Sequence, residues 1–248
     1  RRSALISLSN LGDREMRYAK SGNWWETNVQ RALANNSVNY KEKPDVGTFM
    51  REWLSLYDSK SGERGIYNSM SAKRTTDKLN QKKDKDGNNI IRRHAREDFG
   101  TNPCSEIILR SREFCNLTEC VIRGWDDSKS LKKKVRLATI LGTWQSTLTN
   151  FKYLTGEWKR NCDEERLLGV SLTGIMDNGI TNGGAGGLDE RLTELRNETV
   201  KTNQIWAEKL GIPNSAAITC VKPSGTVSQL VDSASGIHAR HNPYYIRT

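Results

Sequence analysis

The sequence has 248 residues, of which 35% are hydrophobic and 27% are charged. That length and apolar content are enough to bury a core, so they argue against a mainly disordered chain and predict one large domain or two closely packed lobes. The formal net charge of +10 favours polyanionic partners such as nucleic acid or nucleotide phosphates. No run approaches the about eighteen apolar residues of a membrane span, and we expect a cytoplasmic protein with no membrane partner.

The predicted elements alternate between strands and long helices. Residues 3–9 predict a buried strand, and because the chain begins Arg-Arg-Ser without a leading Met, we expect it to start inside a domain. Apolar spacing and end signals then predict helices at 23–33, from Pro44 to about residue 60, at 131–154, at 164–176 and at 188–210, with short strands at 119–123 and 217–221. Strands that alternate with helices indicate an α/β architecture, and no internal repeat is present.

A strongly charged segment interrupts this order at residues 73–98. Between residues 73 and 96 it holds nine Lys or Arg against three Asp and few apolar residues. Such composition is typical of a solvated loop or insertion, and it is also compatible with an RNA or DNA contact. A basic nucleic-acid-binding module is therefore one alternative for the chain.

Three of the five cysteines lie within residues 100–120, in GTNPCSEIILRSREFCNLTEC. Asn102, Cys104 and Glu106 alternate, so on an extended or looped tip their side chains can converge on one face. A thiol between an amide and a carboxylate is equipped for hydrogen abstraction or nucleophilic attack, with Glu106 able to move a proton and Asn102 able to orient a hydroxyl.

Metal binding is a poorer fit to these cysteines. Cys104, Cys115 and Cys120 lack paired two-residue spacing, and the three histidines are not set as their complement, so we expect no metal site. A cysteine hydrolase that uses Cys104 as the nucleophile lacks a well-placed histidine. Packing as small hydrophobic residues accounts better for Cys120, Cys162 and Cys220.

The run Pro223-Ser224-Gly225-Thr226 lies between a predicted strand and a probable helix start. Glycine allows close backbone approach, hydroxyls donate, and amides at a helix N-terminus point at an anion, so the run suits a phosphate. A plain turn in which Ser224 or Thr226 caps a structural helix is the alternative.

Several ordered motifs together resemble one known family. GTNPCSEI, then CNL from Cys115, VRLATILGTWQSTLTNF, EERLLGVSLTGIMD and VKPSGTVSQLVDSASGIHARHNPYYIR resemble the catalytic domain of ribonucleotide reductases, in particular the monomeric, adenosylcobalamin-dependent class II enzymes that reduce ribonucleoside triphosphates. The resemblance covers nearly the whole chain. It implies the C-terminal part of a ten-stranded α/β barrel with a central cysteine-bearing finger loop, with residues 1–248 forming one partial catalytic barrel domain that lacks the earlier barrel half and the C-terminal tail.

The resemblance also implies roles for individual residues. Cys104 would become a thiyl radical that removes the 3′ hydrogen of the ribose, Glu106 would take the 3′-hydroxyl proton, and Asn102 would hold the sugar hydroxyls. Cys115 would be one of the two cysteines that close to a disulfide as they reduce the substrate. The loop residues Ser224, Gly225, Thr226 and Ser228 would hold the substrate phosphates, and Arg1 and Arg2 would follow the loop that couples effector nucleotide to substrate choice.

The implied partners are a ribonucleoside triphosphate substrate, a deoxynucleotide effector, a thioredoxin-like reductant and the remainder of the reductase chain, and the implied cofactor is adenosylcobalamin. A fragment of a metal-radical class I large subunit is the alternative within the family. One departure bears on the finger loop: Ser105 stands where family members commonly have glycine, and serine allows the backbone less freedom.

Overall fold

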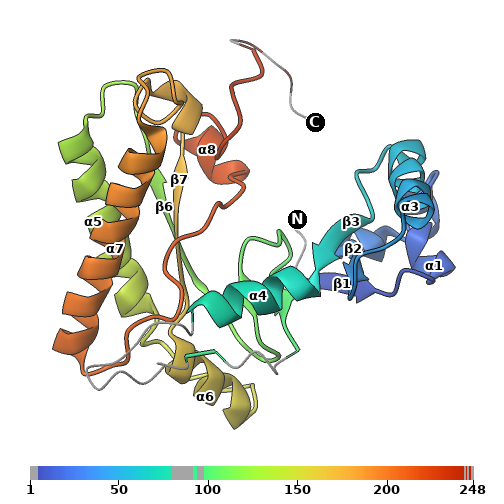
Figure 1. Ribbon diagram of the computed structural model, residues 1–248, viewed down its shortest axis with the longest axis horizontal. Coiled ribbons are helices and arrows are strands. Elements are labelled where there is room, and N and C mark those ends of the chain that lie inside the picture. The colour runs from blue at the N-terminus through green and yellow to red at the C-terminus, as the bar shows by residue number, and fades with distance from the viewer. Residues whose placement is uncertain (1–4, 80–91, 94–97, 243, 245, 247–248) are drawn as a thin grey trace. The chain divides into compact units, whose positions relative to one another are not determined.

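The computed structural model describes residues 5–79, 92–93, 98–242, 244 and 246. The chain divides into two compact units, Arg1–Ser111 and Arg112–Thr248 (Figure 1). Each unit combines parallel strands with helices, so the predicted α/β class is confirmed.

A three-stranded parallel sheet organises the first unit, in the spatial order β1-β2-β3. Its strands are β1 (Leu5–Ser9), β2 (Ala34–Tyr40) and β3 (Gly65–Asn68). The helices of this unit are α1 (Arg14–Arg17), α2 (Trp24–Thr27), the 3-10 helix η1 (Val29–Leu33), α3 (Val46–Ser59) and α4 (Ser69–Leu79). Two short strands, β4 (Gly100–Thr101) and β5 (Ile108–Leu109), pair antiparallel.

Two helix predictions in this unit have different outcomes. The single helix expected at 23–33 is wrong, because Asn28 adopts φ −153° and ψ 85° between α2 and η1, and its side chain accepts a hydrogen bond from the Gln30 amide. An Asn side chain competes for backbone groups in this way and breaks a helix. The helix after Pro44 is confirmed: the Asp45 side chain caps it by accepting from the Thr48 amide at 2.9 Å.

The charged segment begins inside a helix. Residues 73–79 form the second half of α4. Residues 80–91 and 94–97 lie outside the described residues, so the loop expected there stays a prediction.

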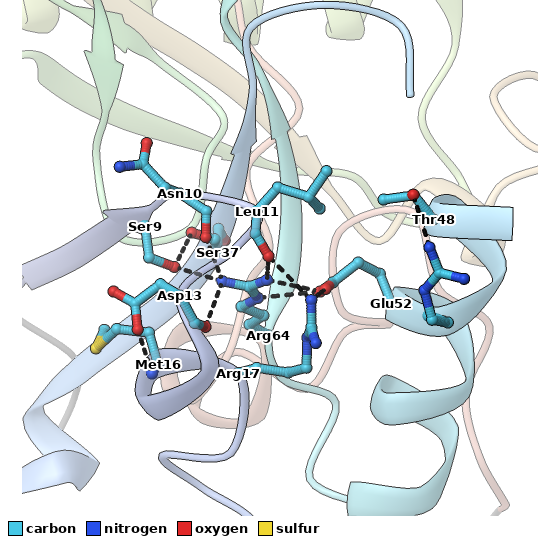
Figure 2. Close-up of polar contacts among 11 residues, drawn as sticks. Ser9, Asn10, Leu11, Asp13, Met16, Arg17, Ser37, Thr48, Glu52 and Arg64 are labelled. Carbon is cyan, nitrogen blue, oxygen red and sulfur yellow. Dashed lines mark hydrogen bonds and ion pairs between the residues drawn. The ribbon is translucent and has the colours of Figure 1, made fainter. Parts of the chain in front are cut away.

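A network of charged side chains holds part of the interior of the first unit (Figure 2). The buried residue of α3 is Glu52, whose carboxylate pairs with Arg64 at 2.9 Å and also with Arg17. The Arg64 guanidinium donates further to the carbonyl oxygens of Asn10 and Leu11 at 3.0 and 3.1 Å. Because Glu52 is 6% and Arg64 4% exposed, this network joins α3 to the segment after β1 out of water.

The second unit is built on the parallel pair of β6 (Asn116–Val121) and β7 (Leu168–Thr173), in register from Asn116 opposite Leu168. Thr219 adds an isolated parallel bridge to Val170 on the other side of β7. The helices are α5 (Ser128–Gln145), α6 (Gly156–Glu165), the 3-10 helix η2 (Ile175–Asp177), α7 (Leu188–Leu210) and α8 (Thr226–Leu230).

An apolar core lies between this pair of strands and the helices α5 and α7. Figure 1 shows α5 and α7 on one side of β6 and β7, and α8 on the other. The core residues come from β6 and the residue after it, from β7 and from both helices: Cys120, Ile122, Leu131, Val135, Ala138, Val170 and Leu195. A capping box of Asp127 and Ser130 starts α5, and Gly211 in the left-handed region ends α7.

Sequence periodicity succeeded for α7 and failed for β7. The helix predicted at 188–210 is confirmed with the same bounds. The helix predicted at 164–176 is wrong, because α6 ends at Glu165 and the apolar run after it is strand β7, buried along nearly its whole length. A strand that is covered on both faces has no alternation to reveal it.

Three further boundaries differ from the predictions in this unit. Helix α5 ends at Gln145 rather than near residue 154, and the strand expected at 217–221 is reduced to the Thr219 bridge. Strand β6 begins at Asn116, slightly before the predicted 119–123. Strand β7 ends at Thr173, and Gly174 after it has φ +78° and lies where a Cβ atom would be 2.6 Å from the Ile122 carbonyl oxygen.

Candidate active site

The loop that carries Cys104 connects β4 to β5 in the first unit. Gly100 pairs with Leu109 and Thr101 with Ile108, so residues 102–107 form the tip of a short hairpin. The Cys104 side chain is exposed at this tip. A thiol on a loop that short strands anchor is accessible to a reactant.

Asn102 and Ser105 set the shape of the loop. The Asn102 side-chain oxygen accepts from the Ile107 amide at 3.0 Å, and the Ser105 amide donates to the Asn102 carbonyl at 2.9 Å. Ser105 has φ +62°, in the left-handed region that glycine adopts without strain. The serine at this position therefore keeps a backbone conformation for which glycine is better suited.

Residues 102, 104 and 106 share this loop, but not through simple alternation. Ser105 turns the chain between them, and the Glu106 carboxylate oxygens are buried whereas Cys104 is exposed. Their convergence on one ligand stays a prediction. Sequence reasoning missed a neighbour: the Asn35 side chain of β2 donates to the Pro103 carbonyl, immediately before Cys104.

Cys115 directly precedes β6 in the second unit. The Thr118 methyl group lies 3.6 Å from where a Cβ of Gly142 on α5 would be, and Cys120 is in the core, so the even-numbered side chains of β6 face α5. Alternation places Leu117 and Glu119 on the opposite face, and the same parity assigns Cys115 to that face.

The loop from Ser224 to Ser228 is fixed to this opposite face by Glu119. The Ser224 hydroxyl donates to the Glu119 carboxylate at 2.5 Å, although 105 residues separate the two. The Ser224 carbonyl accepts from the Ser228 hydroxyl at 3.3 Å and from the Ser235 hydroxyl. Sequence reasoning did not single out Glu119; its even spacing from Cys115 was the available signal.

Ser224 does not cap helix α8. The N-cap position is Gly225 and makes no side-chain cap hydrogen bond, while the Ser228 hydroxyl donates back to the Gly225 carbonyl at 2.8 Å. The alternative of a helix cap by Ser224 or Thr226 is therefore wrong. Ser224 and Ser228 are 6% and 0% exposed, whereas Gly225 and Thr226 reach the surface.

A cavity of about 640 Å³ adjoins this loop. Its lining comes from the loop, from the segment after α8 and from the C-terminal segment: Ser224, Gly225, Ser228, Gln229, Asp232, Ser233, Ala234, Ser235, Ala239, Arg240, His241, Asn242 and Tyr244. The cavity wall thus carries hydroxyl groups, one guanidinium and one carboxylate beside its apolar surface. Such a lining suits a polar, charged ligand.

Arg240 fastens the C-terminal segment at this cavity. Its guanidinium donates to Asp177 at 3.0 and 3.1 Å and to Asp232 at 2.6 Å. Burial raises the pKa of Asp177, but hydrogen bonds from Arg240 and from the Ala234 amide outweigh burial and hold that pKa below its ordinary value. At neutral pH, ion pairs of Arg240 with Asp177 and Asp232 therefore hold the C-terminal segment at the cavity.

The remaining cysteines differ from Cys104 in their surroundings. Burial raises the pKa of Cys120 to about 12, so this thiol is protonated and packs in the core. Cys162 is buried and accepts a hydrogen bond from the Phe114 amide at 3.3 Å. Both agree with the packing role expected of them.

The predicted site residues fall into both units. Asn102, Cys104 and Glu106 belong to the first unit, whereas Cys115 and the residues 224–228 belong to the second. Arg1 and Arg2 lie outside the described residues. Among the site residues that are described, the structure brings the 224–228 loop to the face of β6 that Cys115 shares by parity.

Known proteins resemble the chain in sequence, and one of them does so along its whole length. An adenosylcobalamin-dependent ribonucleoside-triphosphate reductase from Lacticaseibacillus paracasei is 27% identical over 282 aligned residues, which cover 100% of this chain and 34% of that protein. A probable reductase of the same name from Dictyostelium discoideum is 32% identical over 61% of the chain and 20% of its own length. No protein-family profile matches.

Solved structures resemble the chain in fold. A crystal structure of a B12-dependent, class II ribonucleotide reductase aligns with a TM-score of 0.65 and 23% identity, over 94% of this chain and 34% of that one. The chain is similar to the adenosylcobalamin-dependent ribonucleotide reductases. The α subunit of a class Id ribonucleotide reductase from Actinobacillus ureae also aligns, with a TM-score of 0.62 and 13% identity.

These reductases are longer proteins. The chain spans about a third or less of the curated reductases that it matches. The structural neighbours are ribonucleotide reductases, so the predicted relation of the fold to part of the reductase barrel is confirmed. Among the described residues, no helix is long and apolar enough to cross a membrane.

Proposed function

We propose that the chain is part of the catalytic domain of a class II ribonucleotide reductase, which converts ribonucleoside triphosphates to 2′-deoxyribonucleotides for DNA precursor synthesis. The observation that carries this proposal is the hydrogen bond from Ser224 to Glu119. Because Glu119 is four residues after Cys115, about 13 Å along an extended strand, the bond supports a nucleotide with its phosphates at the 224–228 loop and its ribose toward Cys115.

The arrangement of the strands supports the same orientation. Strands β6 and β7 and the Thr219 bridge are all parallel, and the loop at Ser224 follows the last of these segments. In open parallel sheets, ligands bind outside the carboxyl ends of the strands. The cavity at this loop has room for a phosphate chain.

The proposed reaction uses the side chains in balanced steps. The Cys104 thiyl radical takes the 3′ hydrogen atom, Glu106 takes the 3′-hydroxyl proton, and Asn102 holds the sugar hydroxyls. Cys115 and a second cysteine from outside this chain would supply two electrons and two protons as they close to a disulfide: one proton leaves with the 2′-hydroxyl as water, and the other adds to C2′ as the electrons reduce the sugar. Glu106 then returns its proton to the 3′ oxygen, and Cys104 returns its hydrogen to C3′ and is a thiyl radical again.

The cofactor implied by the relatives is adenosylcobalamin. When bound, it supplies the radical that side chains alone cannot start. The fit of this chain to such an initiator rests on the exposed sulfur of Cys104 at the tip of the 102–107 loop. The chain's own part is to present this thiol and to hold the nucleotide.

The further partners belong to the same proposal. A thioredoxin-like protein in the cytoplasm would reduce the disulfide again, and the rest of the reductase chain would complete the barrel. A deoxynucleotide effector would act through a loop of the longer protein that Arg1 and Arg2 follow in the sequence.

Three single substitutions in the full-length protein test the proposal. Cys104→Ser should abolish formation of deoxynucleotide, because serine does not form the radical. Cys115→Ser should abolish turnover, because the reducing pair is incomplete. Cys220→Ser is the control and should keep activity close to that of the unaltered protein. Deoxynucleotide formed by the Cys104→Ser protein would contradict the proposal.

A class I enzyme is the second candidate, because the class Id α subunit aligns nearly as well as the class II structure. The two classes differ in the radical source. Activity of the full-length protein with added adenosylcobalamin and no second subunit would support class II. Activity that instead requires a metal-containing partner subunit would support class I.

A further inference from the structure

We propose that Glu119 is a positioning residue that holds the phosphate loop, residues 224–228, in register with β6. The inference deepens the proposed function and rests on it. Glu119 itself would touch neither the phosphates nor the reacting atoms. It would act through Ser224, whose position in the loop is fixed by the hydrogen bond that its hydroxyl donates to the carboxylate.

The first argument concerns the single proton of each serine hydroxyl. Ser224 donates its proton to Glu119 at 2.5 Å, and Ser228 donates its proton to the Gly225 carbonyl at 2.8 Å. A hydroxyl has one proton to donate, so neither serine can donate to a phosphate while these bonds hold. While these bonds hold, the two hydroxyls shape the loop, so the phosphate contacts that the resemblance implies for Ser224 and Ser228 would not come from their hydroxyl protons, and the exposed part of the loop is at Gly225 and Thr226.

The second argument concerns the hydrogen bonds that connect the phosphate loop to the rest of the second unit. The Ser235 hydroxyl donates to the Ser224 carbonyl, and the Ser233 amide donates to the Ser228 carbonyl at 2.9 Å. These partners belong to residues 224–235, and the far end of that segment is bound to β7 and to the residues after β7 through Ala234 and Gly236. The Glu119 carboxylate binds the loop end of the segment directly, at Ser224, to a different strand, the one that Cys115 precedes.

The third argument concerns charge. A carboxylate repels phosphate, so a negative residue behind a phosphate loop lowers affinity unless it supplies something else. A hydrogen bond to an ionised acceptor is stronger than a neutral one, and Glu119 supplies such an acceptor to a buried hydroxyl. Holding the loop and repelling the ligand predict opposite effects of neutralising Glu119.

The experiment measures KM and kcat for the ribonucleoside triphosphate in the full-length protein. Glu119→Ala should raise KM about tenfold, equivalent to about 1.4 kcal/mol, with a smaller change in kcat. Glu119→Gln keeps a side-chain oxygen for Ser224, so its KM should stay within about twofold of the unaltered protein or fall below it, because repulsion is removed. Glu194→Ala on α7, which removes an exposed pair with Lys132, is the matched control and should leave KM unchanged.

A double-mutant cycle tests whether Glu119 acts through Ser224. Ser224→Ala should raise KM by a similar factor, and the double variant should be no worse than either single variant, because both changes remove one bond. Independent, multiplying effects would overturn the inference, as would an unchanged KM in Glu119→Ala. If Glu119→Ala does not fold, Ser224→Ala with Glu119→Gln carries the same comparison.

The failure of this inference differs from failure of the proposed function. Loss of activity in Cys104→Ser together with an unchanged KM in Glu119→Ala would keep the reductase and discard the positioning role. If the full-length protein reduces no nucleotide at all, equilibrium dialysis with ATP replaces the kinetic measurement. Weaker ATP binding by Glu119→Ala than by Glu194→Ala would then support the inference, and equal binding would overturn it.

Discussion

Residues 5–111 and residues 112–246 bury different kinds of side chain. In the first unit the network of Arg17, Glu52 and Arg64 lies under α3, and the apolar cluster described there has Tyr67, Ala72 and Phe99 at its centre. In the second unit, by contrast, seven buried apolar residues form a continuous cluster between the strands and α5 and α7. The comparison teaches that one α/β chain can hold one part by directional charge pairs and another by apolar contact.

The two kinds of interior respond differently to loss of a side chain. A buried ion pair that loses one member leaves an uncompensated charge, whereas an apolar cluster that loses a side chain is left with a cavity. The following changes test this difference, from the largest expected effect to the smallest.

Glu52→Ala should destabilise the first unit most. Arg64, 4% exposed, would keep its guanidinium buried without the carboxylate, which costs about 3–5 kcal/mol in the free energy of unfolding. Native-state hydrogen exchange of the amides in β1 to β3 measures this unit separately from the other. The exposed Glu42→Ala is the control, with an expected change within about 0.5 kcal/mol. Equal effects of the two changes would show that the network contributes little.

Leu131→Ala should destabilise the second unit by about 2–5 kcal/mol, because Leu131 is 2% exposed and its removal leaves a cavity beside β6. The effect should be the same at low and high salt, since no charge is involved. Urea unfolding followed by exchange of the β6 and β7 amides measures it. Leu137→Ala on the same helix, where the side chain is 52% exposed, should cost far less. A loss as large for Leu137 as for Leu131 would contradict the described orientation of α5.

Asp126→Asn tests a charged group in the unit with the apolar core. Burial raises the pKa of Asp126, but hydrogen bonds from Lys134, the Arg123 amide and Ser130 outweigh burial and lower it. A lowered pKa contributes stability that is present above the ordinary value of about 4 and is lost as pH falls through the folded value.

Asp126→Asn should therefore cost about 1.5–3 kcal/mol at pH 7 and flatten the loss of stability between pH 5 and pH 3. Unfolding free energies at stepped pH values check both expectations. The exposed Asp189→Asn should keep the acid-dependent loss of the unaltered chain. An unchanged pH profile in Asp126→Asn would show that other carboxylates are responsible.

Ser105→Gly should have the smallest effect and the opposite sign. Ser105 has φ +62°, so glycine removes backbone strain and, after its own entropy cost, should stabilise the first unit by about 0.5–1 kcal/mol. Ser71→Gly inside α4 is the matched control and should destabilise by about 0.5 kcal/mol, because glycine is the poorer helix former. Thermal unfolding measures both. Destabilisation by Ser105→Gly would mean that the loop does not strain the serine.

The type and bounds of a helix or strand could be predicted from the sequence only where the pattern of apolar side chains matches their burial. Helix α7 has one buried stripe, so its period and its terminal Gly211 predicted both ends. Strand β7 is buried on both faces, so the run around Val170 and Leu172 has no alternation, and the sequence alone wrongly predicts a helix there. Asn28 divides a predicted helix through its own side-chain hydrogen bond, which no periodicity records.

The candidate site was predictable in its residue types and not in its contacts. The motif around Cys104 and the loop at Ser224 could be recognised from the letters alone. The bond from Ser224 to Glu119 joins positions 105 residues apart and depends on the fold. The glycine that family members commonly have at position 105 indicates a special backbone conformation there. That Ser105 adopts the left-handed region is known only from the structure.

Gly174 restricts how this chain can diverge. A Cβ atom there would lie 2.6 Å from the Ile122 carbonyl oxygen, and the backbone at φ +78° already disfavours any other residue. Random mutagenesis of this codon should return glycine alone among folded clones, whereas the exposed Leu137 should accept many replacements. Homologous sequences can therefore differ at many surface positions. Gly174, which follows β7 and lies against Ile122 after β6, must stay glycine.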